Sequence, residues 1–354
     1  MTGFDSPRQG GTPPWRQDGL LAFRSARVAI GKCVASPRSE AVRHTLAMNT
    51  ALLFPGQGSQ RVGMGRDLAH EFPVARQTYE EADDVLGFAL SALCFEGPES
   101  ELTLTQHTQP AILTTSIAVL RVLVERGLVF DVVAGHSLGE WSALVAAGAL
   151  QFRDAVRLTR LRGTYMQDAV PVGQGGMAAL IGLDLAQVQA ICAAAAQPGE
   201  PVEPANINGG GQIVVSGHSA AIDRVIPEAK AAGAKRAIRL VVSAPFHCSM
   251  MKPAADQLAA VLADVAIAAP QVPVVANVTA EPTQDPARIK ALLIEQVTAT
   301  VRWEESIQAI AGRGVTRAYE LGSGSVLRGL VKRITASIET TTIGEPAEVK
   351  AFTA

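Results

Sequence analysis

The sequence predicts an α/β protein in which helices cover a mostly parallel sheet and a small second domain is inserted. Three observations predict this class. Short apolar strands alternate with helices along most of the chain, the order that builds parallel sheets. One internal stretch of about 70 residues instead reads strand–helix–strand–strand–helix–strand. Aromatic residues are sparse, at 5%, while apolar residues make up 48%, which favours strands packed against helices over a β-sandwich.

Composition and charge limit the classes of partner. The formal net charge is −2, so the overall charge does not indicate nucleic acid or an anionic membrane as a partner. No apolar run approaches the roughly 20 residues of a membrane-spanning helix. The cysteines are far apart and form no CxxC pair: Cys33, Cys94, Cys192 and Cys248. We therefore expect neither a disulfide framework nor a metal site, and a location in the reducing cytoplasm.

Residues 1–47 differ from the rest of the chain. They are rich in Arg, Gly, Pro and Ser and contain only three acidic residues, Asp5, Asp18 and Glu40. One interpretation is a disordered or targeting leader, since transit peptides are rich in Arg and poor in acids. The other, which we favour, is an upstream start codon chosen in error, with Met48 as the true start. In either case we place this segment outside the fold.

The large domain is expected to span residues 48–172 and 243–346. Its sheet begins with the apolar strand 52–54 and continues with a strand at 129–134, each followed by a glycine-containing turn. Pro110 suits the first turn of a helix predicted over 109–126. The other elements expected here are helices at 74–86, 141–148, 155–167, 254–264, 287–296 and 304–313, and strands at 272–277 and 317–321.

The inserted domain is expected to span residues 173–242. A glycine-rich turn at 209–211 separates its two central strands. The order of elements is the ferredoxin-like order, βαββαβ. The expected elements are strands at 176–182, 204–208, 212–216 and 237–242, and helices at 185–196 and 220–232.

The run Gly135-His136-Ser137-Leu138-Gly139 matches the nucleophile-elbow pattern G-x-S-x-G. An apolar strand precedes it and a helix of small residues follows it, as this motif requires. The sharp turn lifts the serine hydroxyl out of the sheet and places it at a helix N-terminus, where developing negative charge is favoured. Ser137 is thus predicted to be an activated serine on an α/β-hydrolase-like sheet; the alternative is an idle turn residue. Glu140 is expected to stabilise the N-terminus of the following helix.

A serine nucleophile needs a base and an oxyanion hole. His247 lies where the chain re-enters the large domain, but spacing alone does not select it from the six histidines. The loop 55–60 follows the first strand, so it should lie at the same sheet edge as Ser137. That loop is either a plain βα turn or the element that places the backbone amide of Gln57 beside that of Leu138.

The chain also carries an ordered set of short motifs: FPGQGSQ (54–60), TQPA (108–111), GHSLGE (135–140), RG (162–163), GGMAALIG (175–182), NGGGQIVVSG (208–217), PFHC (245–248) and LGSGSVLRGL (321–330). Several motifs in the right order and spacing are far more specific than any one of them. Together they resemble the malonyl-CoA:acyl carrier protein transacylases of fatty acid synthesis. The resemblance covers about residues 50–346 and leaves out the leader.

The resemblance implies a role for each matched residue. Ser137 is implied to be the acylated nucleophile, and His247 its general base and later acid. The backbone amides of Gln57 and Leu138 are implied to form the oxyanion hole. Arg162 is implied to bind the free carboxylate of a malonyl group, which suits a guanidinium; from the residues alone it could equally be a surface arginine.

Four further residues follow from the same resemblance. The base is implied to be oriented by a backbone carbonyl rather than an acid, and we place that carbonyl at Asn277. Phe246, directly before the base, goes with malonyl rather than methylmalonyl choice in related acyltransferase domains. Asn206 and Asn208 are expected to contact the acyl thioester, although positions in a hairpin explain them nearly as well.

The implied reaction is a ping-pong transfer of malonyl from malonyl-CoA, through malonyl-Ser137, to the phosphopantetheine thiol of acyl carrier protein. It needs no metal and no redox cofactor, the carrier protein is the expected partner, and we expect a monomer. An acyltransferase supplying a polyketide synthase would use the same residues. A serine esterase or thioesterase is a further alternative, but it usually has an Asp or Glu between Ser and His in chain order. Intact Ser137 and His247 argue against a non-catalytic carrier-binding scaffold.

Overall fold

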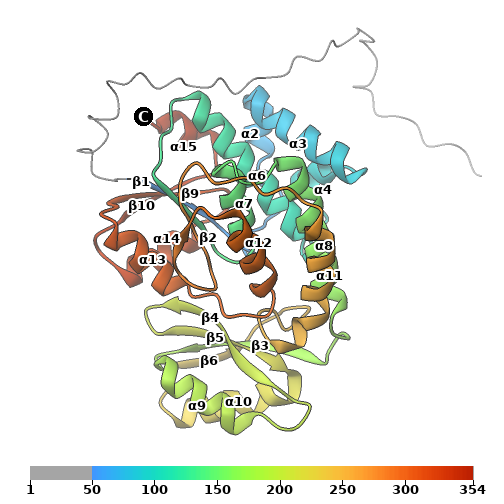
Figure 1. Cartoon of the computed structure of the whole chain (residues 1–354), viewed down its shortest axis with the longest axis vertical. Helices are drawn as coiled ribbons and strands as arrows, with labels where there is room; N and C mark the ends of the chain where they lie inside the picture. Colours follow the sequence, from blue (N-terminus) through green and yellow to red (C-terminus); the bar gives the residue numbers. More distant parts are fainter. Residues whose placement is uncertain (1–49, 354) are drawn as a thin grey trace, which may run out of the picture. The chain divides into compact units, whose positions relative to one another are not determined.

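The computed structural model describes residues 50–353, so the expected leader, 1–47, lies outside the described part of the chain. The described residues form two sheets (Figure 1). The strands of the larger sheet are β1 (Thr50–Phe54), β2 (Val132–Gly135), β7 (Val274–Val275), β8 (Pro282–Thr283), β9 (Arg317–Leu321) and β10 (Glu339–Ile343). Their order is β10–β9–β1–β2–β7–β8, and every pair is parallel except β7–β8.

The centre of the larger sheet explains how two distant loops meet. β1 pairs in parallel with β2, and Phe54, the last residue of β1, lies opposite Gly135. Because parallel strands end at the same edge, the loop after β1 and the turn after β2 are neighbours. This confirms the expected proximity of loop 55–60 to Ser137.

Side chains of β1 alternate between two hydrophobic cores, as a strand's period of two requires. Leu52 and Phe54 pack in one core with residues of α6 (Thr105–Glu125), α7 (Gly139–Ala146), α8 (Phe152–Asp168) and α11 (Lys252–Ala263). Ala51 and Leu53 pack in the other with residues of α13 (Trp303–Gly312) and α14 (Val326–Ile334). The remaining helices of this part are α2 (Arg66–Glu71), α3 (Pro73–Leu86), α4 (Leu90–Glu96), α5 (Glu99–Leu102), α12 (Pro286–Glu295), α15 (Pro346–Ala351) and the 3₁₀ turn Ser249–Met251.

The smaller sheet has the order β4–β5–β3–β6, and all its pairs are antiparallel. In chain order its elements are β3 (Gly175–Ile181), α9 (Leu185–Ala195), β4 (Val202–Gly209), β5 (Gln212–His218), α10 (Ser219–Ala231) and β6 (Arg236–Arg239). The sheet and its two helices share a hydrophobic core of their own. Figure 1 shows both helices on one face of this sheet.

One helix starts earlier than the sequence predicts. α6 begins at Thr105 rather than 109, so Pro110 lies inside the helix and not in its first turn. The extra turn is stabilised by burial, because Thr105 and Thr108 are fully buried and Thr108 Oγ1 donates to Leu102 O at 2.6 Å. These contacts outweigh the one helical hydrogen bond that a proline cannot donate.

Three strands are shorter than expected: β2, β7 and also β6, which ends at Arg239 rather than at 242. Val129 is 78% exposed and β2 begins only at Val132. The strand expected over 272–277 is reduced to Val274–Val275, because the backbone N–H of Asn277 donates to a side chain, the carboxylate of Glu140, at 3.0 Å. The end of β7 therefore leaves the sheet and becomes part of the site.

Candidate active site

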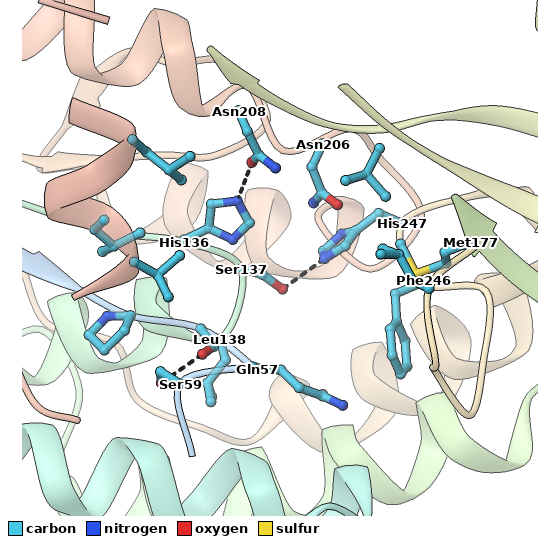
Figure 2. A pocket seen from close by; sticks show the side chains of 18 of the residues that line it. Gln57, Ser59, His136, Ser137, Leu138, Met177, Asn206, Asn208, Phe246 and His247 are labelled. Carbon is cyan, nitrogen blue, oxygen red and sulfur yellow. Dashed lines mark hydrogen bonds between the residues drawn. The ribbon is translucent and has the colours of Figure 1, made fainter. Parts of the chain in front are cut away.

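A cavity of about 660 Å³ is lined by residues of both sheets and their loops (Figure 2). Such a size suits a small-molecule ligand. Of the site residues predicted from the sequence, all but Asn277 line it: Gln57, Ser137, Leu138, Arg162, Asn206, Asn208, Phe246 and His247. Figure 2 shows Ser137 between a side formed by His136 and Asn208 and a side formed by Phe246 and Met177.

The turn that carries Ser137 is a strained one. Ser137 has φ +52°, a left-handed backbone conformation that non-glycine residues seldom adopt. A Cβ on Gly135 would come within 1.9 Å of the backbone of Gly139, and one on Gly139 within 2.0 Å of Phe54 O. Only glycines fit on both sides of the serine, because the turn folds back on itself against β1.

The hydroxyl of Ser137 is paired with His247. Ser137 Oγ and His247 Nε2 are 2.7 Å apart, and His247 Nδ1 lies 2.8 Å from Gln296 O. Since a carbonyl can only accept, Nδ1 carries the proton and Nε2 is free to accept one from the serine. Burial, followed by the positive charge of Arg162, lowers the pKa of His247 to about 3, so the imidazole is neutral at pH 7.

The carbonyl that orients His247 belongs to Gln296 and not to Asn277, so the prediction for Asn277 is wrong. The carbonyl of Asn277 instead accepts from Arg302 N at 2.9 Å. The side chain of Asn277 makes two contacts with the elbow: Oδ1 accepts from Ser137 N, and Nδ2 donates to Gly135 O, both at 2.7 Å. Asn277 therefore holds the elbow from the end of β7.

The amides of Gln57 and Leu138 are candidates for an oxyanion hole. Both residues line the cavity, Gln57 from the loop after β1 and Leu138 from the start of α7. Among residues 50–353, neither backbone N–H has a hydrogen-bond acceptor. Two unpaired amides beside a serine nucleophile are the arrangement that stabilises a developing oxyanion.

Arg162 is buried in the cavity wall, with 1% of its surface exposed. Its Nη1 donates to Gln109 Oε1 at 2.8 Å, while Nη2 donates to Gln296 Oε1 at 3.0 Å and to Ser137 Oγ at 3.3 Å. Within the described residues it has no ion-pair partner, and its Nε has no acceptor. A guanidinium has five N–H donors, so two remain for an incoming anion. Burial lowers the pKa of Arg162 to about 10, which leaves it charged at pH 7.

The two asparagines of β4 face the same cavity as the elbow. Asn206 and Asn208 are each 7% exposed, and Asn208 Oδ1 accepts from His136 Nε2 at 2.8 Å. Figure 2 shows this contact, with Asn206 on the His247 side. Phe246 is 9% exposed and lies across the cavity from His136. The structure therefore brings these predicted residues together around Ser137.

The sequence-based prediction of the site did not include three residues that the structure places there: Gln296, Gln109 and Glu140. Gln109 lies in the TQPA motif, which was a usable signal, whereas Gln296 lies in none of the matched motifs. Glu140 is in the first turn of α7 as expected, but its carboxylate is 3% exposed and accepts from Asn277 N and Gln296 Nε2. Burial raises the pKa of Glu140 to about 7.

A family model described as "Acyl transferase domain" matches residues 51–342 of the chain. The malonyl CoA-acyl carrier protein transacylase of Salmonella typhimurium is 48% identical over 302 residues, 85% of this chain and 97% of the relative. The chain belongs to the malonyl CoA-acyl carrier protein transacylase family. The Bacillus subtilis member is also 48% identical, over 300 residues, 85% of this chain and 95% of the relative.

Solved structures of family members have the same fold. An acyl carrier protein S-malonyltransferase from Vibrio cholerae superposes with a TM-score of 0.84 at 48% identity, covering 86% of this chain and 99% of that one. A malonyl-transacylase solved in complex with a type II polyketide synthase acyl carrier protein gives 0.83 at 47% identity, covering 86% and 98%.

Neither a membrane span nor a metal site is found in residues 50–353. No helix there is both long and apolar enough to cross a bilayer. The same residues contain no group of three or more His, Cys, Asp or Glu side chains placed to hold a metal ion.

Proposed function

We propose that this chain transfers a malonyl group from malonyl-CoA to the phosphopantetheine thiol of an acyl carrier protein, through a malonyl ester of Ser137, for fatty acid synthesis. The observation that carries the proposal is the buried Arg162, without an ion-pair partner among the described residues, 3.3 Å from a serine that is paired with a neutral histidine. Family members with this name at 48% identity support it.

In the first half-reaction, Ser137 Oγ attacks the thioester carbonyl of malonyl-CoA while His247 Nε2 takes the hydroxyl proton. The amides of Gln57 and Leu138 donate to the oxygen that becomes negative. The tetrahedral intermediate then expels the CoA sulfur, which takes the proton back from His247. The imidazolium formed between these steps is stabilised by the Gln296 carbonyl, 2.8 Å from Nδ1.

The second half-reaction uses the same groups in reverse. His247 takes the proton of the carrier's thiol, whose sulfur attacks the malonyl ester. Collapse of the intermediate breaks the bond to Ser137 Oγ, and His247 returns a proton to that oxygen. Because the thiol displaces the ester directly, the cavity must favour thiol over water, a role that suits the apolar side chains of Phe246 and Met177.

Selectivity for malonyl is assigned to Arg162 and Phe246. The malonyl carboxylate would take the donors of Arg162 that have no acceptor, whereas an acetyl group would leave a buried charge unpaired. Asn206 and Asn208, which also line the cavity, are assigned to contacts with the acyl thioester.

The domain division is proposed as residues 48–172 with 243–346 for an α/β-hydrolase-like domain and 173–242 for a ferredoxin-like one. The chain order of the small domain's elements and its antiparallel order β4–β5–β3–β6 support this. We further propose that the protein acts in the cytoplasm, as a monomer, without a cofactor, and with acyl carrier protein as its partner.

Initial-rate kinetics test the proposed mechanism. The rate of malonyl transfer is measured while malonyl-CoA is varied at several fixed concentrations of holo acyl carrier protein. A covalent intermediate predicts parallel double-reciprocal lines, because CoA leaves before the carrier thiol reacts. Intersecting lines would indicate direct transfer in a ternary complex and would reject the malonyl-serine. Ser137→Ala is the inactive control.

A further inference from the structure

Glu140 is a buried acid that the proposed chemistry does not use. It lies three positions after Ser137, in the first turn of α7, and 3% of it is exposed. One of its oxygens, Oε2, accepts two hydrogen bonds: from Asn277 N at 3.0 Å and from Gln296 Nε2 at 2.6 Å. Both donors come from segments more than a hundred residues further along the chain. Glu140 therefore links parts of the site that are far apart in the sequence.

Gln296 is the residue through which Glu140 reaches the reacting groups. Its backbone carbonyl accepts from His247 Nδ1 at 2.8 Å. Its side-chain oxygen accepts from Arg162 Nη2 at 3.0 Å, and its side-chain nitrogen donates to Ser137 O at 3.1 Å as well as to Glu140. One glutamine thus contacts the base, the anion-binding arginine and the backbone of the nucleophile.

The amide of Gln296 has two orientations that differ only by exchange of its oxygen and nitrogen. A carboxylate offers acceptors only, so Glu140 favours the orientation in which the nitrogen faces Glu140 and the oxygen faces Arg162. In the reversed orientation, an NH₂ group would face the guanidinium and a carbonyl oxygen would face the carboxylate. Both contacts would be repulsive in a buried site.

We propose that Glu140 is a positioning residue that sets the amide orientation of Gln296 and thereby aligns Arg162 and His247 with Ser137. The inference rests on the proposed function, because it concerns how those groups are held for malonyl transfer. Glu140 acts as a hydrogen-bond acceptor and not as a proton carrier. The groups it contacts are both amide N–H donors, the backbone amide of Asn277 and the side-chain amide of Gln296.

The test uses the full-length protein, with Glu140→Ala and Glu140→Gln compared. Both the rate of Ser137 malonylation and the ratio of malonyl to acetyl transfer are measured. Glu140→Ala is expected to lower kcat/KM for malonyl-CoA about 100-fold, as small misplacements of reacting groups do. It is also expected to reduce the malonyl preference, because Arg162 is no longer aligned. Glu140→Gln should restore activity to within about tenfold of the wild type, since a glutamine oxygen can accept both bonds.

Gln296→Leu gives a second and independent variant, because it removes the amide but keeps the backbone carbonyl. If Glu140 acts through Gln296, the double variant Glu140→Ala/Gln296→Leu loses no more activity than the worse single variant. Losses that multiply would overturn the proposal. So would a Glu140→Ala variant with an unchanged malonyl-to-acetyl ratio, or a Glu140→Gln variant as impaired as Glu140→Ala.

Asp83→Asn is the matched control for exchanging a partly buried acid. Asp83 lies on α3 and accepts from Ser91 N and Oγ, away from the cavity lining. We expect the thermal stability of this variant to fall while its malonyl-to-acetyl ratio stays at the wild-type value.

Failure of the wild type to form malonyl-Ser137 would reject the proposed function itself, whereas normal malonylation in wild type and Glu140→Ala alike would reject only the positioning role.

Discussion

The residues around Ser137 combine a neutral base with a charged guanidinium. His247 is kept neutral by burial, while Arg162 stays charged in the same cavity wall. The neutral imidazole can accept the serine proton, and the charged guanidinium attracts an anion. The two requirements do not conflict, because the positive charge of Arg162 also disfavours protonation of His247. An acyl group that bears a carboxylate meets both requirements. Its carboxylate can pair with Arg162, and its carbonyl can react with the serine whose proton His247 accepts.

Substituting Arg162 tests the assignment of malonyl selectivity. For Arg162→Ala we expect kcat/KM for malonyl-CoA to fall by about two to three orders of magnitude, because a buried partner of the carboxylate is lost. Acetyl transfer should be unchanged or faster. Arg157→Ala on the same helix is the control, since Arg157 is half exposed and pairs with Asp154 at the surface. Equal losses with both acyl groups would contradict the assignment.

The pH dependence of malonylation tests the state of His247. A histidine of ordinary pKa, 6.5, would be largely protonated at pH 5, and the fraction of neutral imidazole would fall about thirtyfold. With its pKa lowered to about 3, His247 remains neutral there, so the activity should persist as the pH falls. Glu140 also titrates in this range, but a proton on its other oxygen leaves Oε2 able to accept. The measurement is kcat/KM from roughly pH 8 to pH 5; an acid limb centred at pH 6.5 would contradict it.

Single residues also show what the sequence could and could not predict. Ser137 was predictable because the elbow constrains side chains: only glycines fit at positions 135 and 139. Gln296 was not, because its contact with His247 is made by a backbone carbonyl, which every residue type has. The position of Glu140 in the first turn of α7 was predicted, but its contacts with Asn277 and Gln296 were not, because those donors come from distant segments that no local pattern connects to it.

At the scale of elements, the pairing of β1 with β2 is the central feature. It places the Gln57 loop beside the elbow and brings Gly139 against the last carbonyl of β1. Strands and helices with a clear apolar period were predicted to within a few residues, including the strand Arg317–Leu321. The start of α6 was not, because burial of Thr105 and Thr108 overrides the usual placement of proline at a helix start.

Adding a methyl group at the elbow tests this packing. Gly139→Ala places a Cβ within 2.0 Å of Phe54 O, which is backbone and cannot move aside. We expect the free energy of unfolding to fall by about 2 kcal/mol or more, measured by urea denaturation. Gly312→Ala, at the end of α13, meets no atom within 4 Å and should be neutral or slightly stabilising. Equal stabilities of the two variants would argue against the tight turn.

At the scale of the whole molecule, the cavity depends on how the two sheets are joined. Strand β4 is bonded to the segment just before α13: Ile207 N donates to Val301 O, and Val301 N donates to Ala205 O, both at 2.9 Å. These bonds hold Asn206 and Asn208 at the cavity, where Asn208 contacts His136 of the elbow. The cavity therefore forms from both sheets, and every residue that lines it falls between 55 and 333.

Removal of residues 1–47 tests whether this segment contributes to activity. All candidate site residues lie within the described residues, 50–353. A chain that starts at Met48 should therefore keep kcat/KM for malonyl transfer within about twofold of the full-length value. The comparison needs both proteins at equal concentration in the same assay. A large loss of activity or of thermal stability would show that residues 1–47 contribute to the folded protein.

The most direct test of the account is to trap the acyl-enzyme. The protein is incubated with malonyl-CoA in the absence of acyl carrier protein, quenched, digested and analysed by mass spectrometry. The account predicts one malonyl group per chain, on Ser137, that disappears when holo acyl carrier protein is added and that never forms in Ser137→Ala. A malonyl group on another residue, or transfer to the carrier without any adduct, would contradict it.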